Sequence, residues 1–376
     1  MSWAVWITGP PGSGKSLLAR RLAATLRSDG HAVRVLELDE VRQTITPHPA
    51  YSEDEREVVY RALVFMAAEL VAVGVPVIVD ATAHRRVWRD LARAEIARFA
   101  EIQLECPVEV RRARARERRE SHAPPDVYAA AGRPGATVPG VDVPYETSRA
   151  PELRLRTDVQ PIDAMLGRIL DVIGTLSDDG RRAQTSGGED GAVWITGRPG
   201  TGKTTLARAL AQSLTARGIR ARVLAFDDVA ARIHAYRLGP QRGREMANLV
   251  LAYAARLLAE ERVLAVVDAG TGPRAWRAAA RGIVSRFIEV QLTCPAEICQ
   301  TRERAGRWGL WPGRDPQWAR TSGNPDTAPD HEDSINPEVC VRTDGHDIST
   351  TVQDVLRQIA RYIRARVDDA TGNSAR

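Results

Sequence analysis

The stretch GPPGSGKS, residues 9–16, decides the fold because it fits the phosphate-binding pattern GxxxxGK[ST]. An apolar run, AVWI at 4–7, precedes it, and a helical pattern starts at its lysine. In a strand–loop–helix unit of this kind, backbone N–H groups of the loop surround a phosphate, and the helix N-terminus adds partial positive charge. The stretch therefore predicts a P-loop, the nucleotide-binding element of an α/β domain.

A second stretch, GRPGTGKT at residues 197–204, fits the same pattern and again follows AVWI, here at 192–195. Lys15 and Lys203 are the only lysines in the chain, although it has 53 basic residues. Lysine is a compact point charge and arginine a planar fork, so a lysine kept in an arginine-rich chain indicates a crowded site. We expect each lysine to reach the β- and γ-phosphates of ATP.

Each loop offers backbone N–H groups, one ammonium group and one hydroxyl group to a bound nucleoside triphosphate. The hydroxyl that follows the lysine, Ser16 or Thr204, is expected to bind Mg²⁺. The residues predicted to bind ATP are Gly9, Gly12, Ser13, Gly14, Lys15 and Ser16 in the first loop and Gly197, Gly200, Thr201, Gly202, Lys203 and Thr204 in the second.

The chain is an internal repeat beyond these two loops. VIVDA at 77–81 matches AVVDA at 265–269, and RFAEIQLECP at 98–107 matches RFIEVQLTCP at 286–295. A period this long indicates a duplicated domain rather than a solenoid. We predict a P-loop kinase domain at 1–176, a polar, glycine-rich flexible linker at 177–190, and a second, divergent P-loop kinase-like domain at 191–376.

Apolar runs alternate with helical patterns within each copy. This alternation predicts an α/β fold in which a mainly parallel sheet carries helices on both faces. In the first copy, strands are predicted at 4–8, 33–38, 75–80, 101–105 and 153–156, and helices at 15–27, 53–73, 84–98, 108–119 and 161–173.

The composition narrows the class of protein. The chain is 43% hydrophobic and 27% charged, with a net charge of +5, which is ordinary for a globular protein. No apolar run is long enough to span a bilayer, and no basic leader precedes the first motif, so we expect a cytoplasmic protein. The scattered basic residues argue against a nucleic-acid partner, and a homo-oligomer is compatible with the sequence.

Carboxylates follow the second and third predicted strands, at the edge where a parallel sheet binds its ligands. Asp39 is expected to accept the proton of an attacking hydroxyl, and Arg42, one helical turn later, suits a bidentate contact with an anion. The alternative is a helix N-cap aspartate beside a surface arginine. Asp80 and its repeat Asp268 are expected to bind Mg²⁺, with a helix cap as the alternative for Asp80.

Six arginines lie within residues 111–119. A charge run is usually a solvated helix face, but in a small kinase this position forms the lid over the transferring phosphoryl group. We expect Arg114 to act catalytically there, because Arg302 repeats it. The arginines predicted to lie at the surface are Arg111, Arg112, Arg116, Arg118 and Arg119.

The ordered motifs of residues 1–175 resemble adenylylsulfate kinase, the enzyme that phosphorylates the 3′-hydroxyl of adenosine 5′-phosphosulfate in sulfate assimilation. The resemblance implies that Asp39 is the general base, that Arg42 and Arg56 hold the nucleotide sulfate, and that Tyr145 lies near the acceptor. The residues that carry it are the first P-loop, Asp39-x-x-Arg42, Asp54-Glu55-Arg56, Cys106-Pro107-x-Glu109, Gly140-x-Asp142-x-Pro144-Tyr145-Glu146 and Pro151-Glu152-Leu153.

The first copy departs from the family on the acceptor side. Val59 stands where the family usually has asparagine, Asp80-Ala81-Thr82 stands where a serine is usual, and Tyr128 is what remains of a Lys-Gly-Leu-Tyr lid segment. Two alternatives therefore stay open. One is a P-loop kinase for another small-molecule or polynucleotide hydroxyl, and the other is a nucleotide-dependent regulatory protein without transfer chemistry.

The second copy keeps the phosphate side and changes the acceptor side. It retains Asp227 at the position of Asp39, but has Ala230 in place of Arg42 and His331 in place of Tyr145. An insertion with Trp308, Trp311 and Trp318 follows its lid arginine. This pattern predicts a nucleotide site whose acceptor is lost or changed.

Overall fold

A computed structural model gives the fold of the chain, which divides into two compact units, Met1–Gln184 and Thr185–Arg376. Among its described helices, none is long and apolar enough to cross a membrane. The described residues are 2–117, 128–129, 131–133, 135–177, 189–270, 272–306, 331–345 and 347–371.

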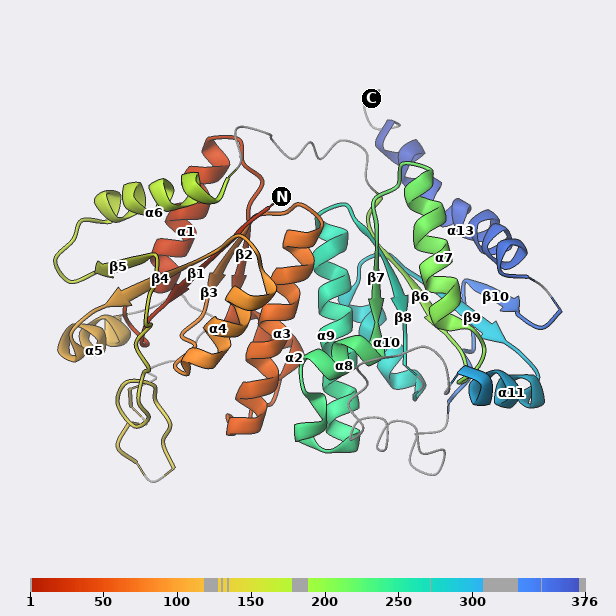
Figure 1. The fold of residues 1–376 in the computed structure, drawn as a ribbon, viewed down its shortest axis with the longest axis horizontal. Coiled ribbons are helices and arrows are strands. Elements are labelled where there is room, and N and C mark those ends of the chain that lie inside the picture. Colours follow the sequence, from red (N-terminus) through yellow and green to blue (C-terminus); the bar gives the residue numbers. More distant parts are fainter. Residues whose placement is uncertain are drawn as a thin grey trace. The chain divides into compact units, whose positions relative to one another are not determined.

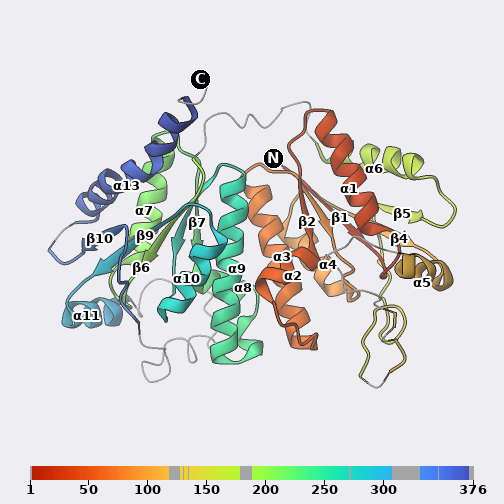
Figure 2. The ribbon, with the colours of Figure 1, turned by 180° about the vertical axis from the view of Figure 1, so that it is seen from behind.

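The first unit is a parallel five-stranded sheet in the order β2-β3-β1-β4-β5 (Figure 1). Helices α1 and α6 cover one face, and α3 and α4 cover the other; Figure 2 shows the same layers from behind. The strands are β1 (Ala4–Thr8), β2 (Arg34–Glu37), β3 (Val77–Asp80), β4 (Phe99–Glu105) and β5 (Leu153–Arg156). The helices are α1 (Lys15–Ser28), α2 (Leu38–Ile45), α3 (Glu53–Ala72), α4 (Arg86–Glu95), α5 (Val108–Glu117) and α6 (Ile162–Leu176).

The second unit repeats this sheet, with its strands in the order β7-β8-β6-β9-β10. Helices α7 and α13 cover one face, and α9 and α10 the other (Figure 1). The strands are β6 (Ala192–Thr196), β7 (Ala221–Ala225), β8 (Leu264–Asp268), β9 (Phe287–Thr293) and β10 (Val339–Arg342). The helices are α7 (Lys203–Ala216), α8 (Phe226–Arg232), η1 (Ala235–Leu238), α9 (Pro240–Glu260), α10 (Arg274–Ile283), α11 (Ala296–Gly306) and α13 (Ile348–Thr371).

Burial on both faces explains why each central strand is an unbroken apolar run. Every residue of β1 is buried. Val5 and Ile7 pack with Leu22 of α1 and Ile169 of α6 in one core. The side chain of Trp6 points to the opposite face, because successive side chains of a strand alternate, and it makes an edge contact with the Phe99 ring. The α/β fold and the tandem arrangement predicted from the sequence are thereby confirmed.

Helix α2 contains the helical turn expected from Asp39 to Arg42, but it begins earlier than the sequence predicted. The strand predicted at 33–38 ends at Glu37, and Leu38 already begins the helix. The buried residues of α2 are Leu38, Val41, Arg42 and Ile45, a helical spacing that starts directly at the strand end. The predicted linker at 177–190 lies mostly outside the described residues and stays a prediction.

Candidate functional site

The first P-loop turns tightly between β1 and α1. Gly12 has a φ of 74°, and a Cβ atom there would lie 2.5 Å from the carbonyl oxygen of Arg111 in α5. Only glycine fits this close approach without moving the backbone. Gly200 is confined in the same way in the second loop, by the carbonyl group of Cys299. Each loop is therefore packed against the first turns of the helix that follows β4 or β9.

The two lysines lie over their own loops. Lys15 Nζ donates a hydrogen bond to the carbonyl oxygen of Pro10 at 3.2 Å. Lys203 Nζ donates to the carbonyl oxygens of Gly197 and Arg198 at 3.0 and 3.2 Å. Each ammonium group thus lies beside the N-terminus of a helix, where an anionic phosphate is stabilised.

A buried carboxylate faces each lysine and the hydroxyl that follows it. Burial raises the pKa of Asp80 to about 6, while the charge of Lys15 and a hydrogen bond from Ser16 oppose that rise. In the second unit, Thr204 Oγ1 donates to Asp268 Oδ2 at 2.5 Å, and burial again raises the carboxyl pKa. A hydroxyl and a buried carboxylate are hard oxygen ligands, so this donor set fits Mg²⁺.

The structure decides against the alternative of a helix cap for both aspartates of the first unit. The residue that caps α4 is Arg85, so Asp80 does not cap that helix. The residue that caps α2 is Glu37, and Asp39 lies in the first turn of the helix itself. Burial is the main cause of the raised pKa of both Asp80 and Tyr60, and the nearby charge of Asp39 adds to each rise, which places its carboxylate close to both groups.

Arg42 and Arg56 lie together in the interior of the first unit rather than on its surface. Arg42 pairs with the fully buried Glu55, with Nη1 3.4 Å from Oε1. Arg56 donates to the carbonyl oxygens of Tyr51 and Thr137 at 3.0 and 3.2 Å. Burial lowers the pKa of Arg56, and the neighbouring charge of Arg42 lowers it further.

The side chain of Tyr145 lies at the carboxyl end of strand β1. Its hydroxyl lies 2.9 Å from Thr8 Oγ1, one residue before the P-loop. Burial raises the pKa of Tyr145 to about 12, so the phenol is neutral at physiological pH. The acids of the same motif have structural roles, because Asp142 accepts from the backbone N–H of Val138 and Glu146 from that of Arg86.

Arg114 is held beside the P-loop by a residue that the sequence analysis missed. Its guanidinium group donates to the Thr157 carbonyl oxygen at 2.7 Å and to the Thr157 hydroxyl at 3.0 Å. The hydroxyl in turn donates to the carbonyl oxygen of Ser13 at 2.9 Å. Arg302 and Thr343 repeat these bonds in the second unit. The sequence Arg156-Thr157-Asp158 at the end of β5 recurs as Arg342-Thr343-Asp344 at the end of β10, and this repeat is the signal that could have revealed Thr157.

The prediction that Arg111 lies at the surface is wrong. It is buried, and it donates to the Cys106 carbonyl oxygen at 3.1 Å and to the Tyr128 hydroxyl at 3.0 Å. Tyr128 donates to the carbonyl oxygen of Pro11 at 2.6 Å, so this pair holds the P-loop from outside. Arg112 and Arg116 are exposed as predicted, and Arg118 and Arg119 lie outside the described residues, as do the three tryptophans of the insertion.

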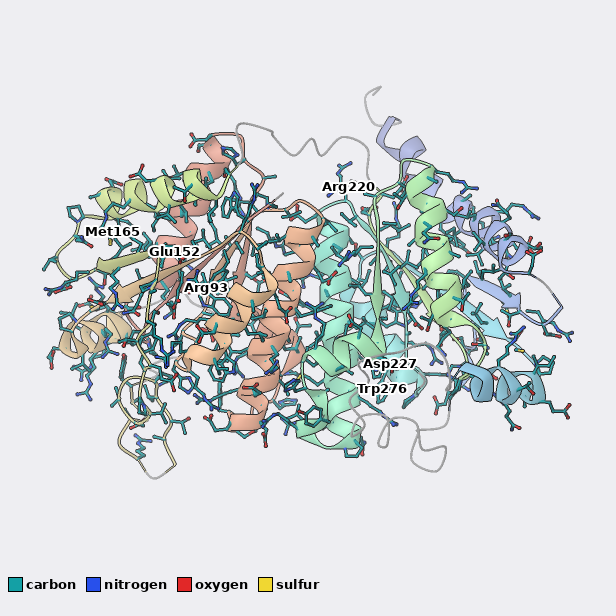
Figure 3. All side chains as sticks on the ribbon, viewed as in Figure 1. Arg93, Glu152, Met165, Arg220, Asp227 and Trp276 are labelled. Carbon is teal, nitrogen blue, oxygen red and sulfur yellow. The ribbon has the colours of Figure 1, made fainter. Side chains whose placement is uncertain are left out.

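An ion-pair network fixes the segment that carries Tyr145. The fully buried Arg89 pairs with Glu101 of β4, with Nε 2.6 Å from Oε1. Arg93 makes a bidentate pair with Glu152 at 2.6 and 2.8 Å, and both are labelled in Figure 3. The second unit repeats the network with Arg277, Glu289, Arg281 and Glu338.

Comparisons with known proteins agree with the repeat. The profile of the family described as adenylylsulphate kinase matches residues 1–156 and 189–311. The chain is 39% identical over 161 residues to a probable adenylyl-sulfate kinase of Archaeoglobus fulgidus, which covers 42% of this chain and 97% of that protein. It is 36% identical over 156 residues to a probable adenylyl-sulfate kinase of Pyrococcus abyssi, which covers 41% and 84%. Among solved structures, the APS kinase CysC of Mycobacterium tuberculosis in complex with AMPPNP and APS is 29% identical, covers 46% of this chain and 98% of that chain, and has a TM-score of 0.41.

Proposed function

The chain belongs to the adenylylsulphate kinase family, and from this premise we propose that its first unit transfers the γ-phosphoryl group of ATP to the 3′-hydroxyl of adenosine 5′-phosphosulfate. One observation supports this acceptor above others. The first unit gathers a carboxylate, two arginines and a tyrosine at the P-loop edge of the sheet, namely Asp39, Arg42, Arg56 and Tyr145.

The proposed mechanism is in-line transfer. The 3′-oxygen forms a bond to the γ-phosphorus while the bond from that phosphorus to the β–γ bridging oxygen breaks, and ADP leaves. Asp39 accepts the proton of the hydroxyl. Lys15 and Arg114 stabilise the negative charge of the transferring group.

Two residues of the first unit would hold the metal ion. Ser16 and Asp80 offer oxygen ligands beside Lys15, and Mg²⁺ bound there supplies further neutralisation of the phosphate charge. The second unit offers the matching pair Thr204 and Asp268, and we propose that it binds ATP as well.

Arg42 and Arg56 are proposed to hold the anionic end of the acceptor. Both guanidinium groups are buried, and Arg56 is bonded to carbonyl oxygens rather than paired with a carboxylate within hydrogen-bond distance. Such an arginine keeps its charge available, and a buried guanidinium binds an oxyanion more strongly than an exposed one.

The test is product formation by the purified chain supplied with ATP, Mg²⁺ and adenosine 5′-phosphosulfate. We expect the 3′-phosphorylated nucleotide in anion-exchange chromatography and mass spectrometry. Asp39→Asn is expected to lower the rate about 100-fold or more. The matched variant Asp227→Asn, at the same position of the second unit, is expected to leave this rate unchanged.

Other outcomes would redirect the proposal. Stimulation of ADP release by a different hydroxyl compound, and not by adenosine 5′-phosphosulfate, would make the first unit a kinase for another acceptor. Tight ATP binding without turnover for any acceptor would favour a nucleotide-dependent regulatory protein. Equal losses in both aspartate variants would contradict the assignment of this transfer to the first unit.

A further inference from the structure

Polar side chains at the end of the central strand are paired with their own unit in the first copy. Trp6 Nε1 donates to the carbonyl oxygen of Ala81 at 3.1 Å. Thr8 Oγ1 donates to the carbonyl oxygen of Thr82 at 2.7 Å and lies 2.9 Å from the hydroxyl of Tyr145. The polar side chains of Trp6 and Thr8, at the end of β1, are therefore hydrogen-bonded within the first unit.

Strand β6 of the second unit has the same sequence as β1, but polar side-chain groups at its end lack hydrogen-bond partners among the described residues. Among the described residues, none hydrogen-bonds to Trp194 Nε1, to Thr196 Oγ1 or to either ring nitrogen of His331. Trp194 and Thr196 are 0% exposed, and the His331 side chain is 3% exposed. The distance of 3.5 Å from His331 Nε2 to Asp333 Oδ1 is too long for a good hydrogen bond. Because buried polar groups are nearly always paired, this cluster indicates a partner that lies outside the described residues.

One exchange contributes to the cluster, at position 331 and at Thr196. His331 stands in the place of Tyr145, and the chain beyond it is anchored as in the first unit, since Glu332 Oε2 accepts from the backbone N–H of Arg274 at 2.8 Å. An imidazole ring is shorter than a phenol. It therefore leaves the hydroxyl of Thr196 without the contact that the tyrosine makes in the first unit.

The loop after β8 also differs from the loop after β3 of the first unit. Glycines replace the larger residues of the first unit, and a Cβ at Gly270 would lie 2.7 Å from the ring of Phe226, while one at Gly272 would overlap the ring of Trp276. The Trp276 side chain is half-buried. Figure 3 shows Trp276 and Asp227 beyond the ends of β7 and β8. An aromatic ring and a carboxylate therefore share this edge of the sheet.

One of the two arginines proposed to hold the sulfate group is missing at this edge. Ala230 replaces Arg42, and Arg244, at the position of Arg56, lies within the field of the carboxylate of Asp227. Burial and nearby cations lower the pKa of His331 to about 4, so its ring is neutral at physiological pH. The unpaired groups are thus neutral donors and acceptors.

We infer that the second unit phosphorylates a neutral polyol, a sugar or sugar alcohol whose hydroxyl groups bond to Trp194, Thr196 and His331. The inference rests on the ATP site proposed for this unit and adds the class of its acceptor. One polyol oxygen forms the bond to the γ-phosphorus as the bond to the β–γ bridging oxygen breaks. The hydroxyl proton passes to Asp227, and ADP leaves.

The test uses the full chain with Lys15→Ala, which silences the first unit. ATP binding is measured by calorimetry, and ADP release is measured with glycerol, D-glucose, myo-inositol or adenosine 5′-phosphosulfate. We expect one of the three polyols to raise ADP release at least tenfold and the sulfated nucleotide to have no effect. His331→Tyr, which restores the phenol of the first unit, should abolish the polyol effect and change the Kd for ATP less than twofold.

Three results would overturn the inference while ATP still binds. These are no stimulation by any of the three polyols, stimulation by adenosine 5′-phosphosulfate, and a polyol effect that survives His331→Tyr. Absence of ATP binding to the Lys15→Ala chain would overturn both this inference and the proposed second nucleotide site. It would leave the proposal for the first unit to its own assay.

Discussion

Asp80 is kept beside Lys15 at a cost in stability. Burial raises its pKa from 3.8 to about 6, so the folded state disfavours the carboxylate. The protonated form adds stability that is fully present below about pH 4 and is lost as the pH rises through 6. A shift of about two units corresponds to about 3 kcal/mol. A stabilising replacement is therefore available at this position, and the charged residue is the one that can bind a cation.

We predict that Asp80→Asn raises the free energy of unfolding of the first unit by about 1–3 kcal/mol at pH 7.5. Near pH 3 the variant and the parent chain should be almost equally stable, since the side chain of Asp80 is then largely uncharged in both the folded and the unfolded state. Differential scanning calorimetry at the two pH values measures this difference. A variant that is less stable than the parent at pH 7.5 would refute the assignment of a destabilising buried charge.

The sequence could predict the positions of some site residues but not the contacts of others. Asp39 and Asp80 could be placed, because the carboxyl ends of parallel strands meet at one edge. Arg111 and Thr157 could not, because their contacts depend on side-chain reach between segments far apart in the chain. Thr157, for example, bonds to Ser13, 144 residues away.

At the scale of elements, one threonine in each unit joins the end of an edge strand, β5 or β10, to the P-loop. Thr157 joins Ser13 to Arg114, and Thr343 joins Thr201 to Arg302. The sequence showed the repeat of this segment but not its contact, because a strand at the edge of the sheet could not be placed beside the loop from periodicity alone. The same limit hid the start of helix α2, whose apolar spacing begins within the run read as a strand.

We predict that Thr157→Val weakens ATP binding to the first unit about tenfold, since one partly buried hydroxyl with two hydrogen bonds contributes about 1–1.5 kcal/mol. The matched variant Thr343→Val should weaken only the second site. Calorimetric titration of each variant, in chains whose other site is silenced by a lysine-to-alanine change, separates the two effects. Unchanged affinity in both would show that this tie does not shape the P-loop.

We predict that the buried ion pair between Arg89 of α4 and Glu101 of β4 contributes strongly to the stability of the first unit. Glu101→Gln leaves the fully buried Arg89 without its counter-charge and should cost about 3–5 kcal/mol. Asp90→Asn, which removes an exposed pair with Arg86 at 4.0 Å, should cost under about 0.5 kcal/mol. Urea unfolding measures both, and similar costs would contradict a structural role for the buried pair.

At the scale of the whole molecule, one chain carries two P-loops with the only two lysines. The tandem fold could be predicted because both loops, their strands and their helices recur in register. The difference between the units could be predicted only in part. Ala230 and His331 showed that the acceptor side changes, but the unpaired groups around Thr196 depend on three-dimensional packing.

We predict that one chain binds two molecules of ATP in the presence of Mg²⁺. Lys15→Ala and Lys203→Ala should each reduce the stoichiometry from two to one, because each ammonium group serves one loop. Isothermal titration calorimetry gives the number directly. A single site in the parent chain would show that one of the two loops does not bind nucleotide.

The most direct measurement is formation of the 3′-phosphorylated product from adenosine 5′-phosphosulfate by Lys15→Arg and Lys203→Arg chains. Each change keeps the charge but replaces the compact ammonium group with a planar fork in a crowded loop. We predict that Lys15→Arg lowers the rate at least about 100-fold, the usual scale for loss of a group that stabilises transition-state charge, and that Lys203→Arg leaves it unchanged. Full activity of Lys15→Arg, or equal loss in both chains, would contradict phosphoryl transfer at the first P-loop.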